Sequence, residues 1–208
     1  MNELLSQFAI TVLGAFFGAA SAFALENLRR KRAESEKTYA NLVQAFLILR
    51  DNYFILYSLQ KTYLDPYRHQ EDRFKVMPQI ATSFTDAKID YASLNCLIEK
   101  DRLDLRDHIF AAEQSHDATI VLLSRLNDCI EESIMEVYID AETGETKVLH
   151  NPDNLPMLEA MIDAFYEVAD ASTEQLGTTV REIAEFVNVQ YPDRKKLELE
   201  SGLFKAES

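Results

Sequence analysis

Hydrophobic positions follow two different patterns along this chain. Residues Leu4 to Leu25 form an apolar run of 22 residues without a charged side chain. In the later segments, apolar residues are interspersed with polar ones. At about 1.5 Å per residue, a helix of this length spans roughly 33 Å, more than the ~30 Å hydrocarbon core of a bilayer. The run therefore predicts a single N-terminal transmembrane helix, assigned to residues 1–28. The segments that follow are too polar to lie in a membrane.

Beyond this run, apolar residues recur at spacings of three and four, which predicts amphipathic helices. The first series starts at Tyr39, and no proline separates it from the apolar run, so both are expected to form one continuous helix. The pattern as a whole predicts a mainly α fold, in which an elongated antiparallel helical bundle occupies residues 39–190. The later helices are expected at Tyr91–Glu99, from Leu103 to about Glu136 with Asp101 as the cap, and from about Asn154 to Val189.

A different pattern, with period two, interrupts the helices once. Residues 136–139 alternate in polarity, residues 141–145 contain turn-forming side chains, and residues 146–149 form a second strand-like segment. This pattern predicts a β-hairpin over residues 136–149. Because an isolated hairpin is marginally stable, it is expected to pair or pack with another element. Residues 64–78 lie between two prolines and are predicted to form a loop, and residues 191–208 are predicted to be a weakly ordered tail.

Small and polar residues of the apolar run share one helical face. They recur at spacings of four and three, and membrane helices associate through such residues because small side chains let backbones approach. This stripe predicts self-association of the helix, either as a packed assembly or as the lining of a narrow pore. The bland alternative is a simple anchor with ordinary small residues. The residues of the stripe are Gln7, Thr11, Gly14, Gly18 and Ser21.

Four basic residues, Arg29, Arg30, Lys31 and Arg32, follow the apolar run, and none precedes it. The positive-inside rule therefore predicts an inner-membrane, single-pass protein with its N-terminus outside and its C-terminal domain in the cytoplasm. We interpret residues 29–38 as a basic neck whose cations contact lipid headgroups. A pair between Glu26 and Arg30 is expected to support the helix there. A cleaved signal peptide is the competing interpretation, but it requires positive charge before the apolar run.

Charge is distributed unevenly over the rest of the chain. Residues 79–190 contain 7 Lys and Arg against 23 Asp and Glu, a net charge of −16. The negative electrostatic potential of this charge repels nucleic acid and anionic lipid from most of the domain. Two cysteines, Cys96 and Cys129, agree with a reducing compartment and argue against a disulfide framework.

Known catalytic motifs are absent from the sequence, which has no P-loop, no dinucleotide-binding glycine motif and no metalloprotease motif. One E-x-x-H motif joins Glu113 to His116, but a di-iron bundle needs two such motifs and further carboxylates. His116 is therefore interpreted as a histidine at the edge of the core. We expect no enzyme, no bound metal and no cofactor.

One basic and aromatic cluster departs from the acidic background. Arginine side chains beside aromatic faces suit a phosphate-bearing ligand, such as a nucleotide or an oligonucleotide signal. The alternative is an ordinary loop with solvated charges. The candidate ligand-binding residues are Lys61, Tyr67, Arg68, His69, Arg73 and Lys75, with Tyr63 and Phe74 nearby.

The order of a membrane helix, a basic neck and a small acidic helical domain resembles the small membrane-anchored effectors of bacterial anti-phage defence systems. The stripe and the cluster Arg29–Arg32 carry this resemblance. It implies a homo-oligomeric channel-forming or membrane-permeabilising effector that is gated by its cytoplasmic domain. The alternative is a membrane-tethered helical adaptor that recruits a cytoplasmic protein partner.

Overall fold

The computed structural model describes residues 2–81, 84, 87–139 and 146–199, with the side chains of residues 2–14, 75–76, 138–139 and 146–147 excepted. This described part is mainly helical and contains a small two-stranded antiparallel sheet, which confirms the mainly α prediction with its hairpin. The chain divides into two units, residues 1–41 and residues 42–208, which are treated separately below.

Helix α1 extends without interruption from Asn2 to Leu59, as the absence of proline predicted. A π-helical turn, η1 (Gln60–Leu64), follows it directly, and the backbone N–H of Asp65 donates to the Gln60 carbonyl at 2.8 Å. The helix therefore ends where Pro66 removes the next backbone donor. The predicted loop over residues 64–78 is irregular except for one short helix, α2 (Arg73–Val76).

In the first unit, the large apolar side chains with described positions are exposed. Phe16, Phe17, Phe23 and Leu25 have exposed fractions between 65% and 71%. Over the part of the chain that the structure describes, no helix is long and apolar enough to cross a membrane. The side chains of residues 4–14, half of the predicted span, lie outside the described residues, so the transmembrane helix stays a prediction.

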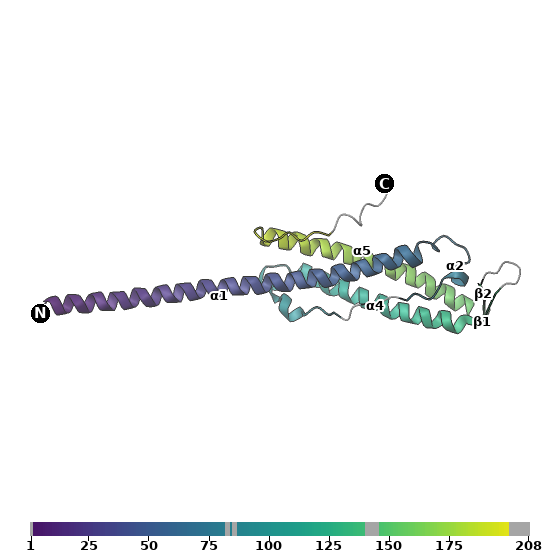
Figure 1. Cartoon of the computed structure of the whole chain (residues 1–208), viewed down its shortest axis with the longest axis horizontal. Helices are drawn as coiled ribbons and strands as arrows, with labels where there is room; N and C mark the ends of the chain where they lie inside the picture. Colours follow the sequence, from purple (N-terminus) through teal and green to yellow (C-terminus); the bar gives the residue numbers. More distant parts are fainter. Residues whose placement is uncertain (1, 82–83, 85–86, 140–145, 200–208) are drawn as a thin grey trace. The chain divides into compact units, whose positions relative to one another are not determined.

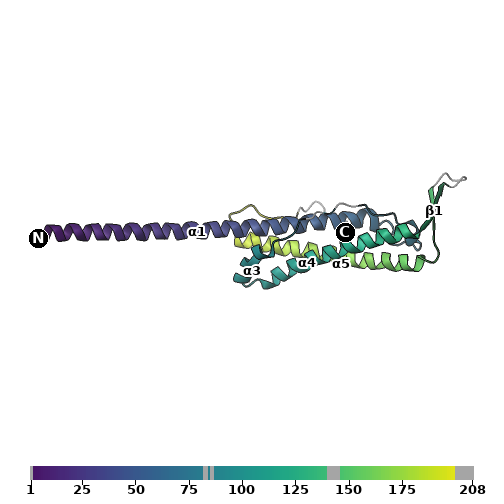
Figure 2. The same ribbon diagram turned by 90° about the horizontal axis from the view of Figure 1, so that it is seen from below.

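The second unit contains the later part of α1 together with α4 (Leu103–Ser133) and α5 (Leu155–Gln190), which lie side by side in both views of Figures 1 and 2. Helix α5 is antiparallel to α4, because residue 108 contacts residue 182 while residue 115 contacts residue 172. It is also antiparallel to α1, since Gln60 contacts Asp170 and Tyr53 approaches Gly177.

The core of this unit is formed by the predicted seams of the three long helices. The buried residues include Leu42, Phe46, Leu49 and Leu56 of α1, Ile109, Leu123 and Leu126 of α4, and Leu158, Ile162, Phe165, Leu176 and Val180 of α5. The seam of α4 was wrong at its first position. Leu103 is 49% exposed and Leu105 is buried instead, because Leu105 precedes Ile109 by four residues and continues the seam, whereas Leu103 precedes it by six.

Asp101 has a different role from the one predicted. It does not cap α4, whose preceding residue, Arg102, makes no side-chain cap. Asp101 has a positive φ of 56° and terminates α3 (Asn95–Glu99), which continues the short 3-10 helix η2 (Tyr91–Leu94). The N–H of Asp101 bonds to the Ile98 carbonyl and that of Arg102 bonds to the Leu97 carbonyl, which is the Schellman arrangement.

The hairpin was correctly predicted, and it begins two residues early. Strands β1 (Ile134–Ile139) and β2 (Thr146–His150) pair antiparallel with Val137 opposite Val148, while the turn at residues 140–145 lies outside the described residues. Helix α4 ends at Ser133 rather than Glu136, where the Ser133 hydroxyl donates to the Ile130 carbonyl. The hairpin lies at the α4–α5 end of the bundle (Figure 2).

The described part of the tail, residues 191–199, has no helix or strand. It is nevertheless attached to α5 by two hydrogen bonds. The Asn188 amide donates to the Leu197 carbonyl at 2.9 Å and accepts from the Leu197 N–H at 2.8 Å.

Candidate functional site

The basic cluster is held against the acidic side of α5 rather than facing open solvent. Arg68 donates to both carboxylate oxygens of Asp170, each at 2.8 Å, and Gln60 donates to the same carboxylate at 2.8 Å. These bonds, opposed by partial burial, raise the pKa of Arg68. The paired guanidinium therefore fixes the segment after η1 to the middle of α5.

A second arginine contacts the same helix about two turns nearer its N-terminus. Arg73 donates to Asp163, and this bond raises the pKa of Arg73. The ring of Tyr166 makes cation–π contacts with both arginines, and its centroid lies 4.9 Å from Cζ of Arg68 and 5.8 Å from Cζ of Arg73. Its hydroxyl donates to the Leu64 carbonyl at 2.7 Å, so Tyr166 ties the end of η1 to α5 as well.

The other candidate ligand-binding residues do not converge on an open site. Lys61 pairs with Asp65 at 2.7 Å, Tyr67 is half-buried and His69 is exposed. The side chain of Lys75 lies outside the described residues. A phosphate-bearing ligand would have to displace two carboxylates from the arginines, so these contacts favour a structural role for the cluster.

We call these contacts the clamp: Asp163, Tyr166 and Asp170 of α5 bind Arg68 and Arg73. Its three α5 residues were not identified from the sequence. Their spacing of three and four places them on one helical face, which is a signal that the sequence contains. Their partners lie about a hundred residues away, at Arg68 and Arg73, and no sequence pattern links the two segments.

Of the predicted stripe, the structure describes the surroundings of Gly18 and Ser21 only, and both are exposed. A Cβ atom placed on Gly18 would meet nothing within 4 Å. The side chains of Gln7 and Thr11 and the surroundings of Gly14 lie outside the described residues. Gly18 thus has open space beside it.

The neck residues Arg29, Arg30, Lys31 and Arg32 are all exposed. Arg30 contacts Glu34 at 3.2 Å rather than the predicted Glu26, because its side chain extends toward the C-terminal turn. The neck therefore presents a compact group of cations, which suits contact with anionic headgroups.

Both residues of the E-x-x-H motif, Glu113 and His116, are buried in the bundle. Glu113 accepts from the Ile89 N–H at 3.1 Å and from the Tyr91 hydroxyl, and so holds η2 against α4. His116 is 2% exposed, its Nε2 has no hydrogen-bond partner, and burial lowers its pKa. In the described part of the chain, no group of three His, Cys, Asp or Glu side chains is arranged to hold a metal ion.

A shallow groove of about 280 Å³ lies between α1 and α5, beside the clamp. Its walls include the stacked rings of Tyr53 and Tyr57, whose centroids are 5.9 Å apart. Gly177 makes this approach feasible, since a Cβ atom there would lie 3.0 Å from the Tyr53 ring. Lys61 and Arg181, at the edge of the same surface, supply cations from the chain itself.

Comparisons of the chain with models of protein families, with curated protein sequences and with solved structures found no match.

Proposed function

We propose that this protein is a homo-oligomeric, single-pass membrane effector that forms a channel or otherwise permeabilises the bilayer. One observation carries the proposal. The large apolar side chains of residues 15–28 are exposed, although the same chain builds a well-buried core from residue 42 onward. A soluble protein rarely leaves so many neighbouring apolar side chains uncovered, so a lipid or protein partner is expected to cover them.

The sequence supplies the second argument. Phenylalanine rings suit contact with lipid tails, whereas Gln7 and Thr11 require hydrogen-bond partners within the membrane. Helices that meet along the stripe satisfy these residues, either across the contact or in a water-filled lumen. The exposed neck cations then lie at the cytoplasmic headgroups.

Gating follows from helix continuity in this proposal. Helix α1 begins in the predicted span and ends in the bundle, so one continuous helix belongs to both. A change in bundle packing that is caused by a signal, such as a nucleotide or a cytoplasmic protein, would bias that element between two arrangements.

The test is release of a trapped dye from lipid vesicles by the purified full-length protein. Gln7→Leu with Thr11→Val should abolish release, because the lumen loses its polar lining. Ile10→Leu with Leu13→Ile, on the rest of the helix, is the matched control and should retain it. Unchanged release in the first variant would remove the pore.

A membrane-tethered adaptor is the second candidate, and the hairpin favours it. Met135, Val137, Val148 and Leu149 are all more than 40% exposed, and grouped exposed apolar side chains of this kind are typical of interaction surfaces. The adaptor would leave vesicles intact in the wild-type protein and would instead need these hairpin residues to recruit a partner.

A further inference from the structure

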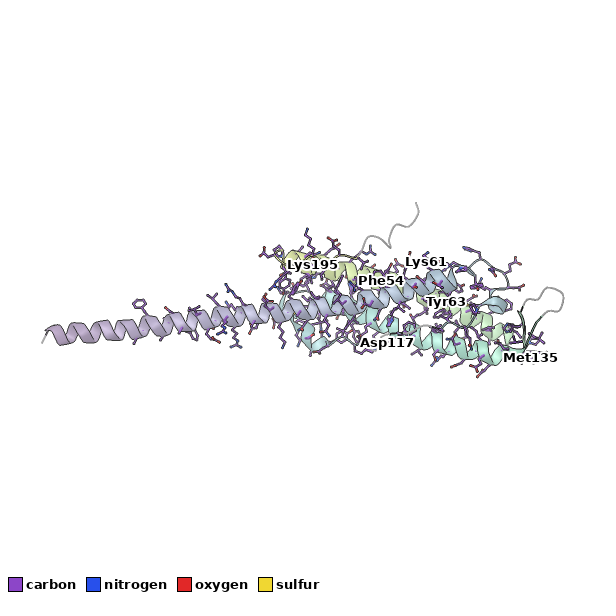
Figure 3. The ribbon with its side chains drawn as sticks, in the orientation of Figure 1. Phe54, Lys61, Tyr63, Asp117, Met135 and Lys195 are labelled. Atoms are coloured by element: carbon purple, nitrogen blue, oxygen red, sulfur yellow. The ribbon has the colours of Figure 1, made fainter. Side chains whose placement is uncertain are left out.

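Helix α1 has a second apolar surface, opposite its buried seam. We name it the α1 strip and define it as Leu47, Phe54, Ile55 and Ser58 of α1 together with Tyr63 of η1, which also packs against the buried core. Leu47 and Ser58 are exposed, and the other three are half-buried. Figure 3 labels Phe54 and Tyr63 along this part of the chain.

The α1 strip is hollowed rather than flat. Phe54, Ile55, Ser58, Leu59 and Tyr63 line a groove of about 270 Å³. The ring of Phe54 is held edge-on by Tyr53, with centroids 5.6 Å apart and planes at 67°. Aromatic side chains, phenylalanine included, are enriched in the cores of protein–protein interfaces, and Phe54 lies beside this groove.

Charge distinguishes this surface from the rest of the bundle. Residues 79–190, which include α4 and α5, carry the net charge of −16, so two copies of the domain repel one another through those faces. Residues 42–63 contain only two cations, Arg50 and Lys61, and one anion, Asp51. Two copies can therefore approach through the α1 strip without like-charge repulsion.

We propose that the α1 strip docks against a second copy of this chain. The inference rests on the proposed function, because the α1 strip has five residues, far fewer than the roughly 20–30 residues per partner of a stable soluble interface. Membrane helices that associate raise the effective concentration of the attached domains, so a small contact suffices. A basic partner protein would instead favour the acidic faces of α4 and α5.

Two serines offer a matched test in the full-length protein in membranes. Ser58 lies in the α1 strip, and Ser124 is equally exposed on α4. With Cys96 and Cys129 replaced by alanine, Ser58→Cys should form a covalent dimer with a short bismaleimide, and Ser124→Cys should not. Adding Leu47→Glu should abolish the dimer, whereas adding Val121→Glu, at a comparably exposed position of α4, should not.

Equal crosslinking at both serines, or none at Ser58→Cys, would overturn the inference. The native mass of the same proteins in detergent separates the two claims. An oligomer that shows no Ser58→Cys crosslinking would contradict docking through the α1 strip but not the proposed function. A monomer in detergent would contradict both. If Ser58→Cys still crosslinks after Gly14→Ile with Gly18→Ile, docking through the α1 strip is supported, and the stripe is not required for assembly.

Discussion

Phe17 and Phe46 belong to the same helix, α1, and have opposite environments. The Phe17 side chain is 65% exposed, whereas the Phe46 side chain is 2% exposed. The same contrast holds for Leu25, which is 68% exposed, and Leu42, which is fully buried. Helix propensity cannot account for the difference, because both regions are continuous helix.

The difference lies in what the chain provides to cover each region. Residues 42–59 have α4 and α5 as neighbours, and their apolar residues fall on one seam. Residues 15–28 have Phe16 and Phe23 on one face of the helix and Leu25 on the opposite face, so their large apolar side chains do not form a single narrow seam. Residues 42–59 therefore contribute to the stability of the fold, and the proposed function depends on residues 15–28.

The largest expected effect on stability comes from truncating a side chain in the buried core. Phe46→Ala should lower the free energy of unfolding by about 3–5 kcal/mol, because it removes a fully packed ring. Phe17→Ala should change it by less than about 0.5 kcal/mol, since no neighbour loses a contact. Urea denaturation in mild detergent, followed by far-ultraviolet circular dichroism, measures both. Equal losses would contradict the division between the two regions.

The two glycines Gly177 and Gly18 sharpen the same comparison. Gly177→Ile should destabilise the bundle by about 1–3 kcal/mol, because its Cβ would lie 3.0 Å from the Tyr53 ring. Gly18→Ile should leave unfolding unchanged, since its Cβ would meet nothing within 4 Å, and should reduce only the oligomer mass. Destabilisation by Gly18→Ile would indicate a contact within its own chain.

A smaller effect is expected at the clamp on α5. Asp170→Asn should cost about 1 kcal/mol, because it loses the charge that Arg68 binds, and a side chain that is 46% exposed is partly screened by solvent. Glu167→Gln, at an exposed position of the same helix, is the control and should have no effect. Thermal unfolding of the three proteins at one pH is sufficient. If Asp170→Asn were as stable as the wild type, the clamp would have no structural value.

The smallest effect is a pH dependence that arises at His116. Burial lowers the pKa of this histidine, so an unfolded chain takes up a proton below its ordinary pKa of about 6.5 while the folded chain does not. The stabilisation is fully present above that pH and declines as the pH falls toward the folded-state pKa. Asp117, 3.8 Å away, and Glu113 oppose the shift, whereas Lys88 adds to it.

Denaturation of the wild type and of His116→Leu at neutral and mildly acidic pH measures this effect. The wild type should lose more stability on acidification than His116→Leu does. The exposed His69 gives the control, and His69→Leu should follow the wild type. A parallel loss in all three proteins would assign the acid sensitivity to other groups.

Sequence periodicity was sufficient for the elements whose apolar residues have a single environment. The seam of α5 from Leu158 to Val187 is buried as predicted, and the hairpin pairs as its alternation indicated. Errors fell at helix ends, where local hydrogen bonds decide. Asp101 terminates α3 instead of capping α4, because its left-handed backbone closes two bonds to the preceding helix.

The sites were harder to predict because they depend on contacts between distant segments. Arg68 and Arg73 have the composition of a phosphate site, and only the fold reveals that Asp170 and Asp163 occupy them. The α1 strip was also missed, since Phe54 and Ile55 become informative only when the opposite seam is known to be covered. The stripe of the apolar run stays a prediction from sequence.

The native mass of the full-length protein in detergent tests the central claim most directly. The account predicts a defined assembly of at least three subunits, because one or two helices cannot enclose a lumen, and it predicts that Gly14→Ile with Gly18→Ile reduces this mass without unfolding the bundle. A monomer or dimer in both proteins would contradict a pore-forming assembly.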